Sequence, residues 1–88
     1  MTDGEPIEVV MKFSQDVAGR VQETRWHPSQ RLKPLAGGGL EMRVTITSTT
    51  DILPWILGWG RQCEVVEPAD LRGRVRTEHE SALSLYSG

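Results

Sequence analysis

Thr50-Asp51-Ile52-Leu53-Pro54-Trp55-Ile56-Leu57-Gly58-Trp59-Gly60 is the most apolar stretch of this chain and contains two of its three tryptophans. Its bulkiest apolar residues recur at i, i+3, i+4 and i+7, namely Ile52, Trp55, Ile56 and Trp59. On a helix with about 3.6 residues per turn, these positions form one continuous stripe. Because such a stripe must be covered, the stretch predicts a short amphipathic helix that packs on the rest of the fold.

The sequence also predicts where this helix begins and ends. Asp51 is suited to cap its N-terminus, and Pro54 then lies in the first turn, where a missing amide donor costs little. Gly58 and Gly60 are expected to supply the positive φ angles that often end a helix.

Alternating apolar and polar residues predict strands on both sides of this helix. Residues 7–13 and 40–47 show the period of two that is expected of half-buried strands. Residues 30–35 and 62–67 predict two weaker strands, and Pro34 favours an edge position for the first of them. The sheet is therefore expected to have four strands.

The remaining segments predict two further helices and a loop. Ser14 is a plausible N-cap for a helix that ends near Arg25 or Trp26, and residues 69–86 favour a long final helix. Residues 36–39, Ala-Gly-Gly-Gly, predict a flexible hairpin loop rather than a phosphate-binding loop, because no helix N-terminus follows them.

In order, the elements are β-α-β-β-α-β-α. Two split β-α-β units joined by a hairpin predict an α+β, ferredoxin-like fold: a four-stranded antiparallel sheet with two helices on one face, plus a C-terminal helix. The first and third strands are then central. The expected structural core is Phe13, Val17, Val21, Trp55, Ile56 and Trp59. The opposite face of the sheet is expected to be polar and to display Glu8, Val10, Lys12, Glu41, Arg43, Thr45 and Thr47.

Length and charge limit the classes of function. The 88 residues are enough for one small domain, which we expect at residues 7–88 after a polar linker at residues 1–6. Such a chain buries only about 60–65% of its unfolded surface, so a second copy or a neighbouring domain would stabilise it. The net charge of −2 argues against DNA binding by this chain alone.

The sequence predicts neither catalysis nor a metal site. Cys63 is the single cysteine and has no zinc-ligand pattern around it, so we interpret it as a buried apolar residue and expect no metal or cofactor. His79 is interpreted as a half-exposed packing residue. No catalytic motif is present, which makes a small enzyme the least favoured interpretation. With no membrane-spanning run and no secretion signal in residues 1–6, we expect a cytoplasmic location and no membrane partner.

The best candidate for ligand binding is the segment at residues 25–31. Its potential contacts with a phosphate or a nucleobase are Arg25, His27, Ser29, Gln30 and Arg31, with Trp26 as a stacking surface. The alternative is a helix-ending turn, in which Trp26 packs at the sheet edge and the polar groups cap backbone ends. The residues alone favour the turn.

Three motifs occur in a recognisable order and spacing: Arg25-Trp26-His27-Pro28-Ser29-Gln30, then Trp55-Ile56-Leu57-Gly58-Trp59-Gly60, then Glu64-Val65-Val66-Glu67-Pro68 with Leu71-Arg72. Together they resemble the C-terminal extension, or WCX domain, of bacterial WYL-domain transcriptional regulators. The resemblance covers about residues 8–86.

This resemblance implies a ferredoxin-like fold and a regulatory role. In such regulators a winged helix-turn-helix binds DNA, a WYL β-barrel senses a ligand, and the extension contributes to dimerisation and to passing the signal to the DNA-binding domain. The expected partners are a second copy, the WYL and helix-turn-helix domains of the parent chain and, for some members, a single-stranded nucleic acid effector. Alternatively, the extension itself binds such a nucleic acid, or a nucleotide, through residues 25–31.

Overall fold

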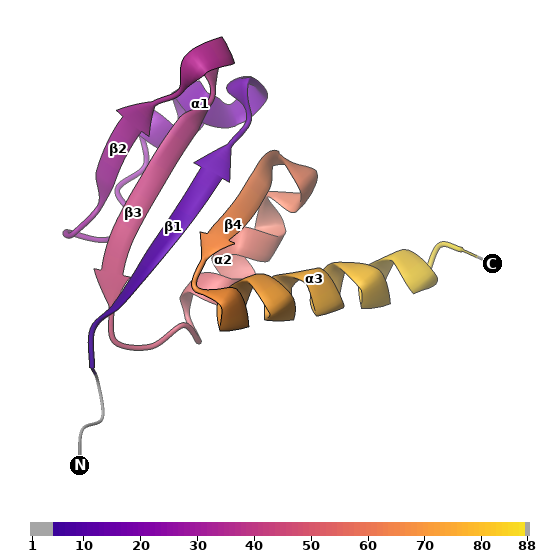
Figure 1. Cartoon of the computed structure of the whole chain (residues 1–88). Helices are drawn as coiled ribbons and strands as arrows, with labels where there is room; N and C mark the ends of the chain where they lie inside the picture. Colours follow the sequence, from indigo (N-terminus) through magenta and orange to yellow (C-terminus); the bar gives the residue numbers. More distant parts are fainter. Residues whose placement is uncertain (1–4, 88) are drawn as a thin grey trace.

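The computed structural model describes residues 5–87, which form one body made of a β-sheet and helices (Figure 1). Residues 1–4 of the predicted linker and Gly88 of the predicted domain lie outside the described residues. The strands are β1 (Ile7–Phe13), β2 (Arg31–Pro34), β3 (Leu40–Ile46) and β4 (Cys63–Glu67). The α-helices are α1 (Gln15–Gln22), α2 (Ile52–Gly58) and α3 (Ala69–Ser84), and short 3-10 turns form η1 (Ala36–Gly38) and η2 (Gly60–Gln62).

The four strands form one open antiparallel sheet in the order β2-β3-β1-β4. The α+β class and the four-stranded antiparallel sheet are therefore confirmed, with β1 and β3 at the centre. Their pairing runs from Ile7 opposite Ile46 to Phe13 opposite Leu40. These two strands carry the clearest alternation in the sequence because each has one face on the core and the other turned away from it.

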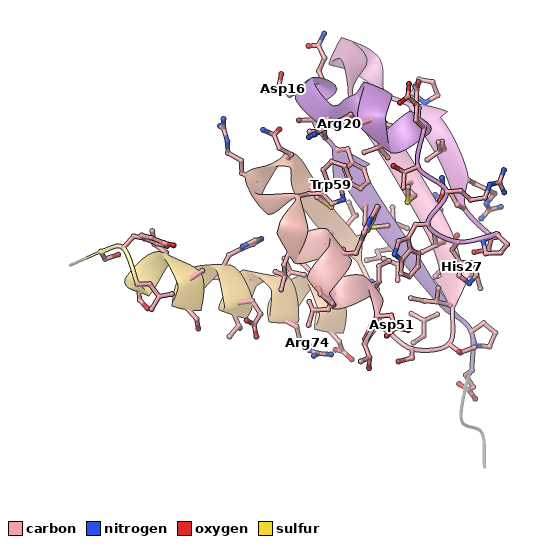
Figure 2. The ribbon with its side chains drawn as sticks, turned by 180° about the vertical axis from the view of Figure 1, so that it is seen from behind. Asp16, Arg20, His27, Asp51, Trp59 and Arg74 are labelled. Atoms are coloured by element: carbon pink, nitrogen blue, oxygen red, sulfur yellow. The ribbon has the colours of Figure 1, made fainter. Side chains whose placement is uncertain are left out.

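Helices α1 and α2 cover one face of the sheet, which is seen from the helix side in Figure 2. Helix α3 follows β4, packs against β4 and α2, and then extends away from the body (Figure 1). No helix in the described part of the chain is both long enough and apolar enough to cross a membrane. The molecule is thus a two-layer fold with one projecting helix.

The core lies between the sheet and the helices. Phe13, Val17, Val21 and Ile56 are buried there, whereas Trp55 and Trp59 are only partly buried and pack against the core from its margin. The two indoles line a shallow hollow between α1 and α2 together with Arg20, Pro54 and Gly58. They are half-covered because both helices are short and no third layer lies over them.

The ends of the helices differ in detail from the predictions. Ser14 occupies the N-cap position of α1, but its hydroxyl donates to the Gln62 side chain instead of capping the helix. Helix α1 ends at Gln22, before the predicted end near Arg25 or Trp26. After α2, Gly60 has a φ of 61°, whereas Gly58 is still helical. One of the two glycines expected to end the tryptophan helix therefore does so.

The open face of the sheet differs from the predicted polar surface at Val10. Val10 was expected on this face as part of a polar surface, yet it is only 3% exposed. It pairs with Arg43 on β3 and with Glu67 on β4, beside an irregularity in the β1–β4 register. Long charged side chains therefore lie directly opposite Val10 on both neighbouring strands, and the stems of such side chains can cover apolar surface while their charged ends stay in water.

Candidate functional site

The segment between α1 and β2 contains the candidate ligand contacts, and the side chain of Gln30 holds it together. Gln30 Oε1 accepts the backbone N–H of Trp26 at 2.8 Å and lies 3.4 Å from the backbone nitrogen of His27. Gln30 Nε2 donates to the Thr24 carbonyl at 2.6 Å. One amide group thus satisfies the backbone of a turn that has no regular secondary structure.

Ser29 attaches the same turn to the sheet. Its Oγ accepts the N–H of Thr45 at 2.8 Å and lies 3.2 Å from the Thr45 carbonyl, next to the end of β3. The backbone N–H of Ser29 donates to Nδ1 of His27 at 3.1 Å. Nδ1 of His27 is therefore an acceptor, which leaves the other ring nitrogen to carry the proton in the neutral side chain. The polar atoms of Ser29 and Gln30, together with Nδ1 of His27, thus hold the backbone of the turn.

Trp26 connects this turn to helix α2. Its ring centroid lies 5.7 Å from that of Trp55, which in turn lies 5.7 Å from Trp59. Phe13 packs edge-on against Trp55 and Trp59, at 5.9 and 5.6 Å. Contacts of this geometry add about 0.5–1.5 kcal/mol each beyond the area they bury. The three tryptophans therefore form one continuous aromatic cluster that joins the turn, β1 and α2.

The two arginines of the segment do not converge. Arg25 is exposed and lines a hollow of about 320 Å³ with Glu23, Gln30 and Leu32, on the side of β2 that faces the core. Arg31 points to the open face, where its Nη2 lies 3.1 Å from Oε2 of Glu8. The structure therefore places Arg25 beside this hollow and Arg31 beside Glu8, while His27, Ser29 and Gln30 lie in the turn between them.

The open sheet face carries a row of charges that the sequence pattern alone does not predict. Directly opposite positions place Lys33, Glu41, Lys12 and Glu64 in one row across all four strands. Arg43 Nε donates to Glu41 Oε2 at 2.8 Å, and this hydrogen bond holds the pKa of Glu41 below its usual value, with smaller contributions from the charges of Arg43, Lys33 and Lys12. The alternation of polar and apolar residues predicts the strands, but which charged residues lie side by side depends on the register between neighbouring strands.

A second concave region lies between β4 and α3. It has a volume of about 400 Å³ and is lined by Cys63, Val65, Val75 and His79, with Arg72 and Arg76 at its rim. Burial raises the pKa of Cys63 to about 12, with Glu64 adding to the shift, so the thiol is protonated and unreactive at neutral pH. Among the described residues, no cluster of His, Cys, Asp and Glu has the makeup of a metal site.

A comparison with protein families gives one match. The family model for the WCX domain matches residues 5–83, which is nearly the whole chain and includes the turn, the tryptophan helix and most of α3. No curated protein matches the chain. Because the family model covers far more than half of the sequence, the chain belongs to the WCX domain family.

Proposed function

We propose that this chain is a non-catalytic regulatory and dimerisation module of a cytoplasmic WYL-type helix-turn-helix transcriptional regulator. In the parent protein it helps to pass an effector signal from the WYL domain to the DNA-binding domain. The observation that carries the proposal is the WCX match over residues 5–83, since WCX domains are regulatory modules of WYL proteins.

The strand order supports the ferredoxin-like fold that we propose for this module. Two split β-α-β units joined by a hairpin require the first and third strands at the centre and the second and fourth at the edges. The order β2-β3-β1-β4, the antiparallel pairing and the position of α1 and α2 on one face agree with that requirement.

The contacts within residues 25–31 support a structural role for this family motif. Gln30 and Ser29 use their side chains to hold the turn and attach it to β3, and Trp26 packs on Trp55. A rigid connection between the edge of the sheet and α2 suits a module that transmits a change in position between domains. Such a role requires stiffness more than an open pocket.

Sedimentation velocity of the purified chain, over a range of concentrations, tests the dimerisation. We expect a reversible monomer–dimer equilibrium at micromolar concentrations. A single monomeric species up to millimolar concentration would contradict self-association by this module.

A second candidate function is direct binding of single-stranded nucleic acid, or of a nucleotide. It is favoured by the exposure of Arg25 beside a hollow of about 320 Å³ and by the 70% exposure of the Arg31 side chain. Fluorescence anisotropy with a short labelled single-stranded DNA at low salt would test it. Binding that is lost in Arg25→Ala and Arg31→Ala but kept in Arg74→Ala, an exposed arginine on α3, would support it. Equal binding by all three variants would exclude residues 25–31 as the contact.

A further inference from the structure

The second half of α3 carries apolar side chains that no other part of the described chain covers. Leu83 is 66% exposed and Tyr86, just beyond the helix, is 86% exposed. The buried residues of α3, Leu71 and Val75, both lie in its first half. Figure 1 shows the second half standing clear of the sheet and of the other helices. A helical segment without tertiary contacts gains little stability in water, and neighbouring exposed apolar residues favour association with a partner.

The first half of the same helix borders a cleft that is partly apolar, and its lining also includes Glu64, Arg72, Arg76 and His79. The cleft between β4 and α3 has a volume of about 400 Å³, which is suited to a few side chains. Its apolar lining comes from Cys63 and Val65 on β4 and from Ala69 and Val75 on α3. The chain thus has both a cleft with an apolar part and exposed apolar side chains that could fill it.

The cleft and the exposed side chains lie on one face of α3. Val75, His79, Leu83 and Tyr86 follow one another at intervals of three or four residues, which keeps them on the same side of a helix. Because the helix is continuous from Ala69 to Ser84, Leu83 and Tyr86 do not reach the cleft of their own chain. A second copy, running antiparallel, brings them to it.

In a two-fold symmetric pair, each copy fills the cleft of the other. With the symmetry axis near His79, Leu83 of one copy lies opposite Val75 of the other, and Tyr86 lies opposite Arg72, in both directions. Such a contact is self-complementary, as closed dimers require, and leaves no unfilled cleft to continue the assembly.

The charges beside this face fit the same arrangement. Arg76 and Glu80 form an ion pair within the chain, with Nε and Oε2 3.2 Å apart. In the antiparallel pairing, Arg76 of each copy also lies beside Glu80 of the other.

Nε2 of His79 is buried without a hydrogen-bond partner in the single chain, so the centre of this face contains a polar group that remains unsatisfied.

We propose that two copies of this chain associate through α3 in an antiparallel, two-fold symmetric pair, in which Leu83 and Tyr86 of each copy fill the β4–α3 cleft of the other. The proposal rests on the dimerisation proposed above and names the surface that carries it.

The first test compares Leu83→Glu with Leu85→Glu by sedimentation velocity of the full chain. Both positions are exposed, at 66% and 78%, and the charge change is the same, but Leu85 lies on a different side of the helix axis. We expect Leu83→Glu to raise the dimer dissociation constant at least tenfold and Leu85→Glu to leave it within about twofold, with unchanged circular dichroism in both. Dimerisation of Leu83→Glu at the wild-type constant would overturn the surface but leave dimerisation intact. A monomeric wild type would refute both.

The second test uses the charges to show that the contact is between chains. In a dimer of Arg76→Glu, each of the expected contacts joins two glutamates. In a dimer of Glu80→Arg, each of them joins two arginines. Each variant alone should therefore dimerise at least tenfold more weakly than the wild type. In an equimolar mixture every such contact joins a glutamate to an arginine, so the mixed dimer should form with nearly the wild-type constant. A mixture that associates no better than its separate components would overturn the antiparallel register.

Discussion

The side-chain amide of Gln30 holds the backbone of Trp26, whose N–H it accepts at 2.8 Å, and donates to the carbonyl of Thr24 at 2.6 Å. This relationship explains how a turn without regular secondary structure can position an indole that packs on α2. The stability of the aromatic cluster should therefore depend on a polar residue outside it.

Replacing Gln30 by Leu should lower the free energy of unfolding by about 1–3 kcal/mol, because it leaves backbone groups of the turn without partners. Urea denaturation followed by tryptophan fluorescence measures this change. Gln22→Leu is the matched control, since Gln22 is exposed at the end of α1. Equal effects of the two substitutions would show that the Gln30 bridge does not stabilise the turn.

Replacing Gly39 by Ala should destabilise the protein, whereas Gly73→Ala should stabilise it. A Cβ on Gly39 would lie 2.8 Å from the carbonyl oxygen of Phe13, so the hairpin or β1 has to move, at a cost of about 1–3 kcal/mol. A Cβ on Gly73, inside α3, meets nothing within 4 Å, and alanine there should add about 0.5–1 kcal/mol. Thermal unfolding of both variants measures the opposite signs, and a stabilising Gly39→Ala would contradict the close approach.

Cys63 should make stability depend on alkaline pH. Its folded-state pKa of about 12 is higher than its ordinary value of 9.0, so the folded chain keeps a proton that the unfolded chain loses. The contribution to stability is therefore fully present below about pH 9 and is lost as the pH rises toward 12. Between pH 8 and pH 10.5, the urea midpoint should fall more in the wild type than in Cys63→Ala. An equal fall of the urea midpoint in the two proteins would show that folding does not raise the pKa of the thiol.

Glu41 should make stability depend on acid pH in the opposite sense. Its pKa lies below the ordinary value of 4.5, chiefly because of the hydrogen bond from Arg43, so its contribution is present above that value and is lost as the pH falls. Arg43→Gln should reduce the difference in stability between pH 6 and pH 3. Lys33→Gln removes a charge that contributes less and should reduce the difference less. A larger effect of Lys33→Gln would mean that the hydrogen bond is not the main cause.

Local patterns determined most of the secondary structure. The period of two in residues 7–13 and 40–47 identified the two central strands, and the stripe from Ile52 to Trp59 identified α2. The pattern is readable because each of these segments has one face on the core and one face away from it. Helix α1 ends earlier than the pattern predicts, because the turn that follows is held by the side chain of Gln30 and not by a helix-breaking residue.

Sequence alone therefore established an α+β domain, its central strands and a tryptophan helix that packs on the sheet. Only the tertiary structure decided how deeply Trp55 and Trp59 are covered, that Arg25 and Arg31 lie on different sides of β2, and that a cleft lies between β4 and the face of α3 that leads to the exposed Leu83. Periodicity reports which residues share a side of an element. The exposure of a residue and its partners depend on what lies across from that side, and segments distant in the chain supply it.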